Sequence, residues 1–190
     1  MKASDEAFSR FQKFMQCFAA AVQSRSRAAK NGSFLEYVCL CSTIVDGLLR
    51  IGLILKHQVD TGSSDILEEL LDKTGNQDMM TEGTVYRRAL EEGIIDQSLF
   101  VELNTLHGKR NIVVHEYIIS DMTTEKVLEI GVQYRKALDS VKHRVQDIEA
   151  QQVRRGVATT NVGREVSDAV RPEVEQQTSN AEAYQHKFSW

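Results

Sequence analysis

The chain has 190 residues, of which 42% are apolar, and its 23 basic and 27 acidic side chains give a formal charge of −4. This composition is typical of a soluble globular protein and excludes fibrous and intrinsically disordered chains, because the apolar side chains suffice for one sizeable core. The negative charge argues against a generally basic surface, so any contact with a polyanion must use a local basic patch.

Two long helices are predicted in the first third of the chain. The first opens at Ser4, a suitable N-cap, and closes at Asn31-Gly32, with one apolar stripe along it. The stretch SFLE, residues 33–36, has the pattern of a capping box and predicts the start of the second helix. That helix is apolar almost all round, which favours a central position in a bundle.

The apolar segment 34–55 is long enough to suggest a membrane span. Asp46 and Arg50 fall near its centre, however, and each would cost about 2.5–3.5 kcal/mol in a bilayer. We therefore expect a buried core helix and no membrane contact.

The middle of the chain is more broken. The loops DTGSSD and KTGNQD flank a short predicted helix, residues 66–71, and another short helix is expected over residues 84–92. Asp96 then caps a longer helix, on which apolar side chains form one stripe: Leu99, Leu103, Leu106, Val113 and Tyr117.

The last long helix is predicted to begin near Thr123 or Thr124 and to end at Arg154-Arg155-Gly156. Its seam is close to a heptad pattern, which suits a long partner helix or a second subunit: Val127, Tyr134, Leu138, Val141, Val145 and Ile148. We therefore predict an all-α fold, a bundle of four to five main helices over residues 1–155. A polar extension, residues 156–190, is expected to be flexible or docked on a partner.

The three cysteines are Cys17, Cys39 and Cys41, all within apolar helical patterns. An odd number without spaced pairs is not a disulfide framework and predicts a reducing cytoplasm. Because Cys39-x-Cys41 lacks a second ligand pair, small core residues are a better interpretation than zinc ligands. The N-terminal stretch MKASDEAFSRF has acids where a signal peptide has its apolar run, so secretion is not expected.

The stretch HGKRNIVVHEY, residues 107–117, places Arg110 where the next apolar residue of its helix is due. On a helix, Arg110 and Tyr117 fall nearly on one line, while Asn111, His115 and His107 share the neighbouring line. An unpaired buried guanidinium costs several kcal/mol. Either Asp46 pairs with Arg110, or this flank faces a cleft or subunit interface kept open for an anionic ligand; both interpretations stay open.

The stretch RNIVVHEY resembles the Arg-x4-His-x-Tyr signature of HEPN domains, specifically the HepT-like toxins of toxin–antitoxin pairs. Arg110, Asn111, His115 and Tyr117 match the signature, and the helical order resembles the family over roughly residues 4–150. The resemblance implies a homodimer in which two motif helices meet, so that each subunit contributes an arginine and a histidine to a composite cleft. It also implies metal-independent endoribonuclease activity, with no cofactor.

The residue types suit this chemistry. His115 can accept or donate a proton near neutral pH, and Arg110 offers a planar fork of donors to a phosphate. Asn111 can bind the phosphate or orient His115, and Lys109 with His107 forms a local basic patch for RNA. His107 and His115 lie about 12 Å apart along a helix, too far to share a metal, so no metal site is expected.

Tyr117 has two interpretations. Its ring can pack in the apolar stripe while its hydroxyl helps to hold the helix. Alternatively, as the family implies, a partner nucleotidyltransferase antitoxin places AMP on it, and the added negative charge blocks Arg110. Two other functions stay open for the whole chain: a non-catalytic HEPN module that binds a nucleotide or a partner, and a helical scaffold in which Arg110 only pairs with Asp46.

Overall fold

The structure is a computed structural model that describes residues 2–71 and 80–157. The predicted loop KTGNQD lies outside the described residues, as does the predicted C-terminal extension after Val157. The chain divides into two units, of which Met1–Val157 is the first. In the described residues the fold is all-α, as predicted, and contains no strand. Its elements are α1 (Lys2–Lys30), α2 (Phe34–Thr61), the short 3-10 helix η1 (Glu68–Leu70), α3 (Glu82–Glu91), α4 (Gln97–His115) and α5 (Thr124–Arg155).

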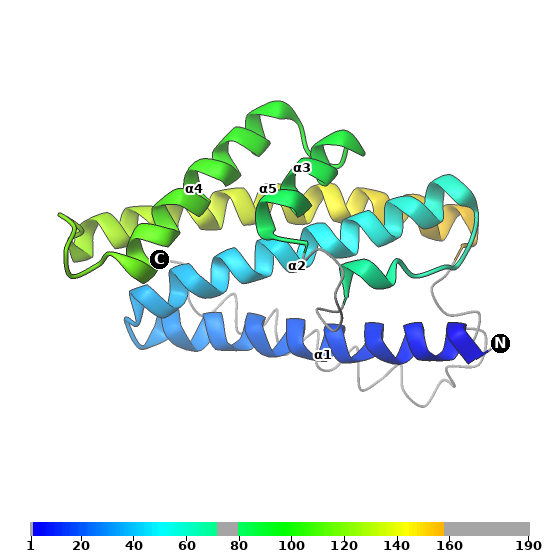
Figure 1. The fold of residues 1–190 in the computed structure, drawn as a ribbon, viewed down its shortest axis with the longest axis horizontal. Helices are drawn as coiled ribbons and strands as arrows, with labels where there is room; N and C mark the ends of the chain where they lie inside the picture. Colours follow the sequence, from blue (N-terminus) through cyan, green and yellow to red (C-terminus); the bar gives the residue numbers. More distant parts are fainter. Residues whose placement is uncertain (1, 72–79, 158–190) are drawn as a thin grey trace. The chain divides into compact units, whose positions relative to one another are not determined.

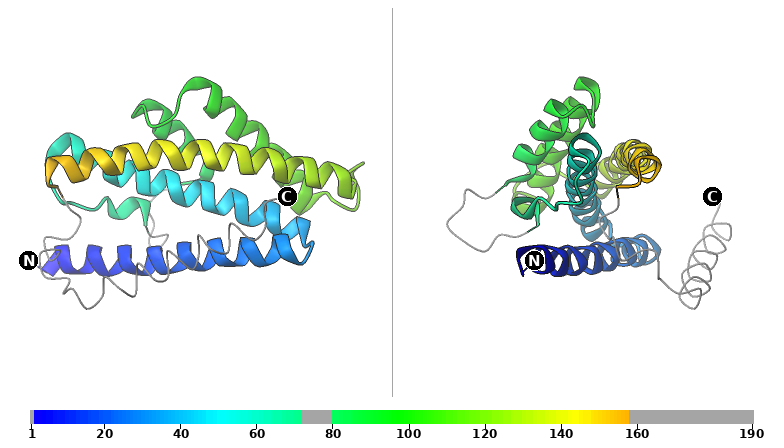
Figure 2. Two further views of the ribbon diagram at one scale, coloured as in Figure 1. Left: turned by 180° about the vertical axis from the view of Figure 1, so that it is seen from behind. Right: turned by 90° about the vertical axis from the view of Figure 1, so that its right-hand side faces the viewer.

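Helix α2 is the central element of the first unit. It packs against α1, α3, α4 and α5, and Figure 1 shows it between α1 on one side and the α3–α4 pair on the other. The end-on view in Figure 2 places α5 beside α2, away from α3. Among the described helices α2 is long and apolar enough to cross a membrane. The predicted burial in a bundle is nevertheless observed, because many residues of α2 are buried against the helices around it.

The predicted seam of α5 is buried along its whole length, from Val127 to Ile148. Its long partner helix is α2 of the same chain, so this seam does not need a second subunit to cover it. Close packing requires Gly52 on α2, because a Cβ there would lie only 3.1 Å from Cγ2 of Val145 on α5.

Local signals predicted most helix ends. The side chain of Asp96 accepts a hydrogen bond from the Leu99 amide at 2.9 Å, and Thr123 caps α5 through the Lys126 amide. Gly156 closes α5 with φ +68°, a backbone conformation that residues with a Cβ atom disfavour. The capping box at Ser33 was wrong: its hydroxyl caps nothing, and the backbone there has φ −81° and ψ 70°.

The other differences are shifts of one turn or less, except in the middle segment. Helix α1 begins at Lys2 rather than after Ser4, and α3 begins at Glu82 with Thr81 as its N-cap rather than near Thr84. The predicted helix 66–71 is only the 3-10 turn Glu68–Leu70.

A buried arginine fixes the start of α3. Arg50 donates to the carbonyl of Leu70 at 2.8 Å and to that of Met80 at 2.9 Å, while its Nε meets Asp46 at 2.7 Å. Both carbonyls belong to the connection between α2 and α3, Leu70 at the end of η1 and Met80 just before the N-cap of α3, so one side chain of α2 holds two points of that connection. The first turn of α3, which carries Glu82, is thereby positioned against α2.

Candidate functional site

Arg110 on α4 lies in a polar cluster between α2 and α3. Only 18% of its side chain is exposed. Its Nη2 lies 2.5 Å from both carboxylate oxygens of Glu82, its Nη1 donates to Asn111 Oδ1 at 2.9 Å, and its Nε donates to Ser42 Oγ at 3.3 Å. The guanidinium is therefore paired within the chain, as burial of a charge requires.

The carboxylate that meets Arg110 is Glu82 rather than Asp46, which was one of the two alternatives left open by the sequence. Asp46 pairs instead with Arg50, one turn further along α2, at 2.7 Å. The physical reason is spacing, because an i, i+4 pair on one helix meets without any change in tertiary packing. Glu82 was missed because the sequence placed the start of α3 at Thr84, which left Glu82 in a loop.

His107, Asn111 and Glu82 form a connected network beside Arg110. His107 Nδ1 lies 2.5 Å from Glu82 Oε2, and its Nε2 lies 3.1 Å from Asn111 Nδ2. Because Arg110 is only a donor, Asn111 must turn its oxygen to Arg110 and its amide nitrogen to His107. His107 Nε2 then accepts, so the ring carries its proton on Nδ1 and donates it to Glu82.

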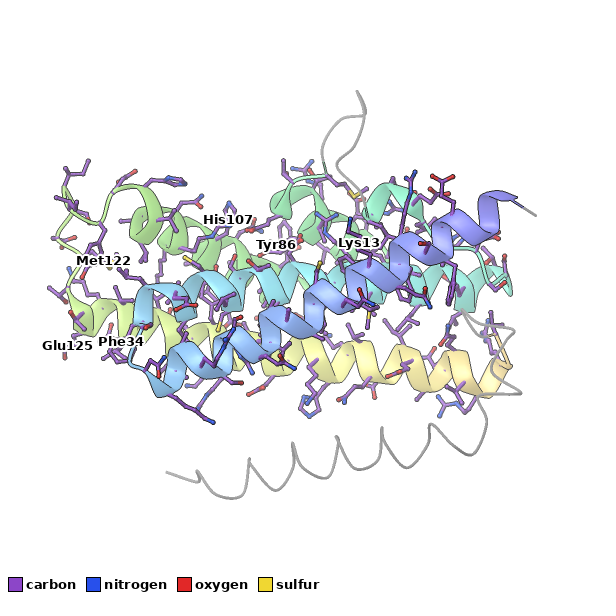
Figure 3. All side chains as sticks on the ribbon, turned by 90° about the horizontal axis from the view of Figure 1, so that it is seen from below. Lys13, Phe34, Tyr86, His107, Met122 and Glu125 are labelled. Atoms are coloured by element: carbon purple, nitrogen blue, oxygen red, sulfur yellow. The ribbon has the colours of Figure 1, made fainter. Side chains whose placement is uncertain are left out.

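Two buried tyrosines lie near the cluster. Tyr86 on α3 and Tyr134 on α5 are both fully buried, and neither hydroxyl has a hydrogen-bond partner among the described residues. Burial raises the pKa of Tyr134 to about 12 and raises that of Tyr86 further, and the negative charge of Glu82 acts in the same direction on both. Figure 3 shows Tyr86 next to His107. The two rings meet edge to face, with their centroids 6.3 Å apart.

His115 is placed differently from Arg110. It is the last residue of α4 and is exposed, and it makes no hydrogen bond or ion pair within the described part of the chain. It lies five positions after Arg110, which corresponds to a rotation of about 140° on a helix. Since Arg110 turns inward to Glu82, His115 turns outward. The single flank of α4 that was predicted to carry both side chains is therefore not formed within one chain.

Two further candidates have other surroundings. Tyr117 lies beyond the end of α4, not on its apolar line; it is half-buried and borders a surface groove of about 460 Å³ that Phe34 and Thr124 also line. Lys109 reaches across to α5, where its Nζ donates to Gln133 at 2.9 Å. It therefore does not add its charge to the Arg110 cluster.

The cysteines do not form a site. Cys41 is buried, as predicted for a small core residue, whereas Cys39 is half-buried and Cys17 is exposed. Burial raises the pKa of the Cys41 thiol. In the residues that the structure describes, no three His, Cys, Asp or Glu side chains are grouped so that they could hold a metal ion.

Residues 62–151 match the family model described as "Ribonuclease HepT-like". This match is consistent with a HepT-like domain in this part of the chain. Neither the curated proteins nor the solved structures include a match to the chain. The HepT-like segment contains Glu82, His107, Arg110, Asn111 and His115, while Ser42 on α2 lies outside it.

Proposed function

We propose that the protein is a metal-independent endoribonuclease of HEPN type. The observation that carries the proposal is the HepT-like match over residues 62–151, because this segment contains Arg110, Asn111 and His115 on one helix. RNA is the substrate that the family's name implies.

The reaction uses the ribose 2′-hydroxyl as an internal nucleophile. His115 takes the proton of that hydroxyl or gives one to the 5′-oxygen as it leaves, and both tasks suit an imidazole near neutral pH. Arg110 stabilises the negative charge that builds on the phosphate, and Asn111, bonded to Arg110 at 2.9 Å, orients it. The products are a 2′,3′-cyclic phosphate and a 5′-hydroxyl.

The two catalytic side chains diverge within one chain, so we propose that the site is composite and needs a second copy. An outer face of α4 supports this, defined by Val101, Thr105, Gly108, Ile112 and His115, which recur every three or four residues. Val101 is 54% exposed, and a Cβ at Gly108 would meet nothing within 4 Å. The exposed glycine in the middle of this mixed face allows close approach of another helix.

The register of such a pair is specific. Arg110 lies two residues before Ile112 and His115 three residues after it. A twofold axis close to Ile112 therefore brings His115 of one copy to the same height along the helix axis as Arg110 of the partner subunit, whose side chain must leave its inward position beside Glu82 to meet it.

Cleavage of a fluorescent single-stranded RNA in EDTA tests the activity. The wild type is expected to cleave it, whereas Arg110→Ala and His115→Ala lose at least about 100-fold in rate. His143→Ala is the matched control, because His143 is also exposed but lies on α5. Equal rates for all four proteins contradict the proposal.

Mixing the two inactive variants tests the composite site. If Arg110 and His115 come from different subunits, a dimer of Arg110→Ala with His115→Ala retains one intact site. After subunit exchange the activity should rise to about a quarter of the wild-type value, because half of randomly formed dimers are mixed. No recovery after confirmed exchange places both residues of a site in one chain.

We also propose the biological setting that the resemblance implies: a toxin or phage-defence effector in the cytoplasm, controlled by a partner nucleotidyltransferase that places AMP on Tyr117. The half-buried position of Tyr117 beside an open groove is compatible with both its packing role and its modification. Mass spectrometry of the protein co-expressed with its neighbouring genes distinguishes the two roles by the mass of AMP on Tyr117.

The second candidate is a non-catalytic HEPN module that binds a nucleotide or a partner protein. It is favoured by one observation: Arg110 is neutralised by Glu82, and no hydrogen bond joins it to His115 within the described chain. Saturable binding of ATP or AMP, lost in Arg110→Ala and unaccompanied by RNA cleavage, would select this function.

A further inference from the structure

The Glu82 carboxylate occupies the side of Arg110 that a phosphate needs. A phosphate is held most firmly by two parallel N–H groups of one guanidinium. Here Nη2 serves both oxygens of Glu82, Nη1 serves Asn111 and Nε serves Ser42. Each nitrogen of the fork is already engaged, and an arriving phosphate also meets the negative charge of Glu82.

The cluster offers Glu82 a second set of donors. The hydroxyls of Tyr86 and Tyr134 are buried and meet no described atom at hydrogen-bonding geometry, although Ser42 and Arg110 lie close to that of Tyr134. Burying polar groups without such partners is costly. Both rings lie close enough to Glu82 for its charge to raise the pKa of their hydroxyls. These groups are donors, and a carboxylate released from Arg110 is an acceptor.

We propose that Glu82 is an internal substitute for the RNA phosphate, which binds Arg110 only when the carboxylate exchanges this partner for the hydroxyls of Tyr86 and Tyr134. This inference rests on the proposed ribonuclease function and adds the control of its anion site. The free protein holds the site closed to anions of low affinity, and a polyanionic strand that gains other contacts supplies the energy of the exchange.

The exchange also changes the orientation of the histidine network. Glu82 accepts the Nδ1 proton of His107, and His107 in turn accepts from Asn111. When Glu82 leaves, His107 loses its acceptor, and Asn111 is free to turn with Arg110 toward the phosphate. Phosphate entry is thereby coupled to three side chains of α4.

Binding of a 2′-O-methyl oligoribonucleotide, measured by fluorescence anisotropy in EDTA, tests the exchange. This strand lacks the 2′-hydroxyl and is not cleaved by the proposed reaction. Glu82→Gln should bind it about ten-fold more tightly than the wild type. The matched control is Glu69→Gln, which removes an equal charge from the Glu69–Arg88 surface pair and should leave the affinity unchanged. Equal affinities of Glu82→Gln and the wild type overturn the inference.

The tyrosines give a second measurement. Replacing both Tyr86 and Tyr134 by Phe should weaken binding several-fold in the wild type but not in Glu82→Gln, because no charged carboxylate then needs their hydroxyls. Equal weakening in both backgrounds overturns their part in the exchange. If Glu82→Gln does not fold, Glu82→Asp decides in its place: its shorter carboxylate holds Arg110 less firmly and should raise the affinity.

The binding result is separable from the proposed function. If the wild type does not cleave ordinary RNA but Glu82→Gln binds the strand more tightly, the exchange holds and the ribonuclease proposal fails. If the wild type cleaves RNA and the variant gains no affinity, the exchange fails alone.

Discussion

Glu82 and Arg110 join α3 to α4 through an ion pair in which both carboxylate oxygens lie 2.5 Å from Nη2. Their side chains are 22% and 18% exposed, so water screens the pair less than it screens a surface pair. The pair therefore stabilises the bundle as well as fixing the direction of the arginine, and these two effects can be separated by measurement.

A double-mutant cycle on Glu82→Gln and Arg110→Met measures the stabilising effect. We expect a coupling energy of about 1–3 kcal/mol in urea unfolding followed by circular dichroism. Each single change leaves a charge or a polar amide in a mostly buried cluster. The loss of unfolding free energy in each single variant should therefore be more than half of the loss in the double variant. The Glu69–Arg88 surface pair should couple by only about 0–1 kcal/mol, and an equal coupling there would contradict the buried role.

His107 and His115 should respond to mutation in opposite ways. His107→Ala removes the partner of both Glu82 and Asn111, so the free energy of unfolding should fall by about 1–3 kcal/mol. His115→Ala removes an exposed side chain without a hydrogen bond in the described structure and should leave stability unchanged. RNA cleavage should show the reverse order, with the larger loss in His115→Ala; a greater loss of activity in His107→Ala would assign the proton transfer to His107.

Asp96 gives the stability a defined dependence on pH. The hydrogen bond from the Leu99 amide, followed by that from Arg144, lowers the pKa of Asp96 below its ordinary value of 3.8. The folded protein therefore binds this proton less readily than the unfolded chain, so the stabilisation is complete above pH 3.8 and is lost as the pH falls through the folded-state value.

The variant Asp96→Asn isolates this effect, because asparagine is also a good N-cap but carries no charge. Near neutral pH the wild type should melt at a higher temperature than Asp96→Asn. The difference should shrink as the pH falls below 3.8 and vanish well below it. A difference that is the same at every pH would show that the charge of Asp96 does not stabilise α4.

The helices were predictable because their signals are local. The Asp96 cap, the glycine that ends α5 and the apolar stripes each depend on residues within one or two turns. Ser33 shows the limit of such signals: the tight turn after α1 sets its backbone, which leaves its hydroxyl away from the amides that a capping box would use. Even so, α2 begins at the next residue, because burial of its apolar side chains stabilises the helix without the cap.

The site was predictable only in part because its contacts are distant in the chain. The motif identified Arg110 and Asn111 on one helix, but Glu82 is 28 residues away and Ser42 is 68 residues away. Their meeting depends on how α2, α3 and α4 cross, which periodicity does not specify. Tyr117 was placed on the helical line because the pattern continued, whereas α4 ends at His115.

Gly108 offers a test of the proposed dimer that separates folding from association. It is exposed in the middle of α4, and a Cβ there would meet nothing within 4 Å. Gly108→Ala should therefore raise the stability of the single chain by about 0.5–1 kcal/mol through helix propensity. Gly52→Ala is the control, since its Cβ would lie 3.1 Å from Val145 Cγ2 and should cost about 1–3 kcal/mol by overpacking.

Self-association should change in the other direction. If two outer faces of α4 meet near Ile112, the added methyl of Gly108→Ala keeps the two helices further apart. Sedimentation equilibrium should then show a weaker dimer in a more stable chain, and RNA cleavage should fall at protein concentrations where the variant is monomeric. Any loss of RNA cleavage in Gly52→Ala would come from the destabilised fold and not from the dimer interface, because Gly52 lies against α5 of the same chain. A more stable Gly108→Ala that dimerises as the wild type does would exclude the outer face of α4 as the interface, and with it the level arrangement of His115 and Arg110 of the partner subunit.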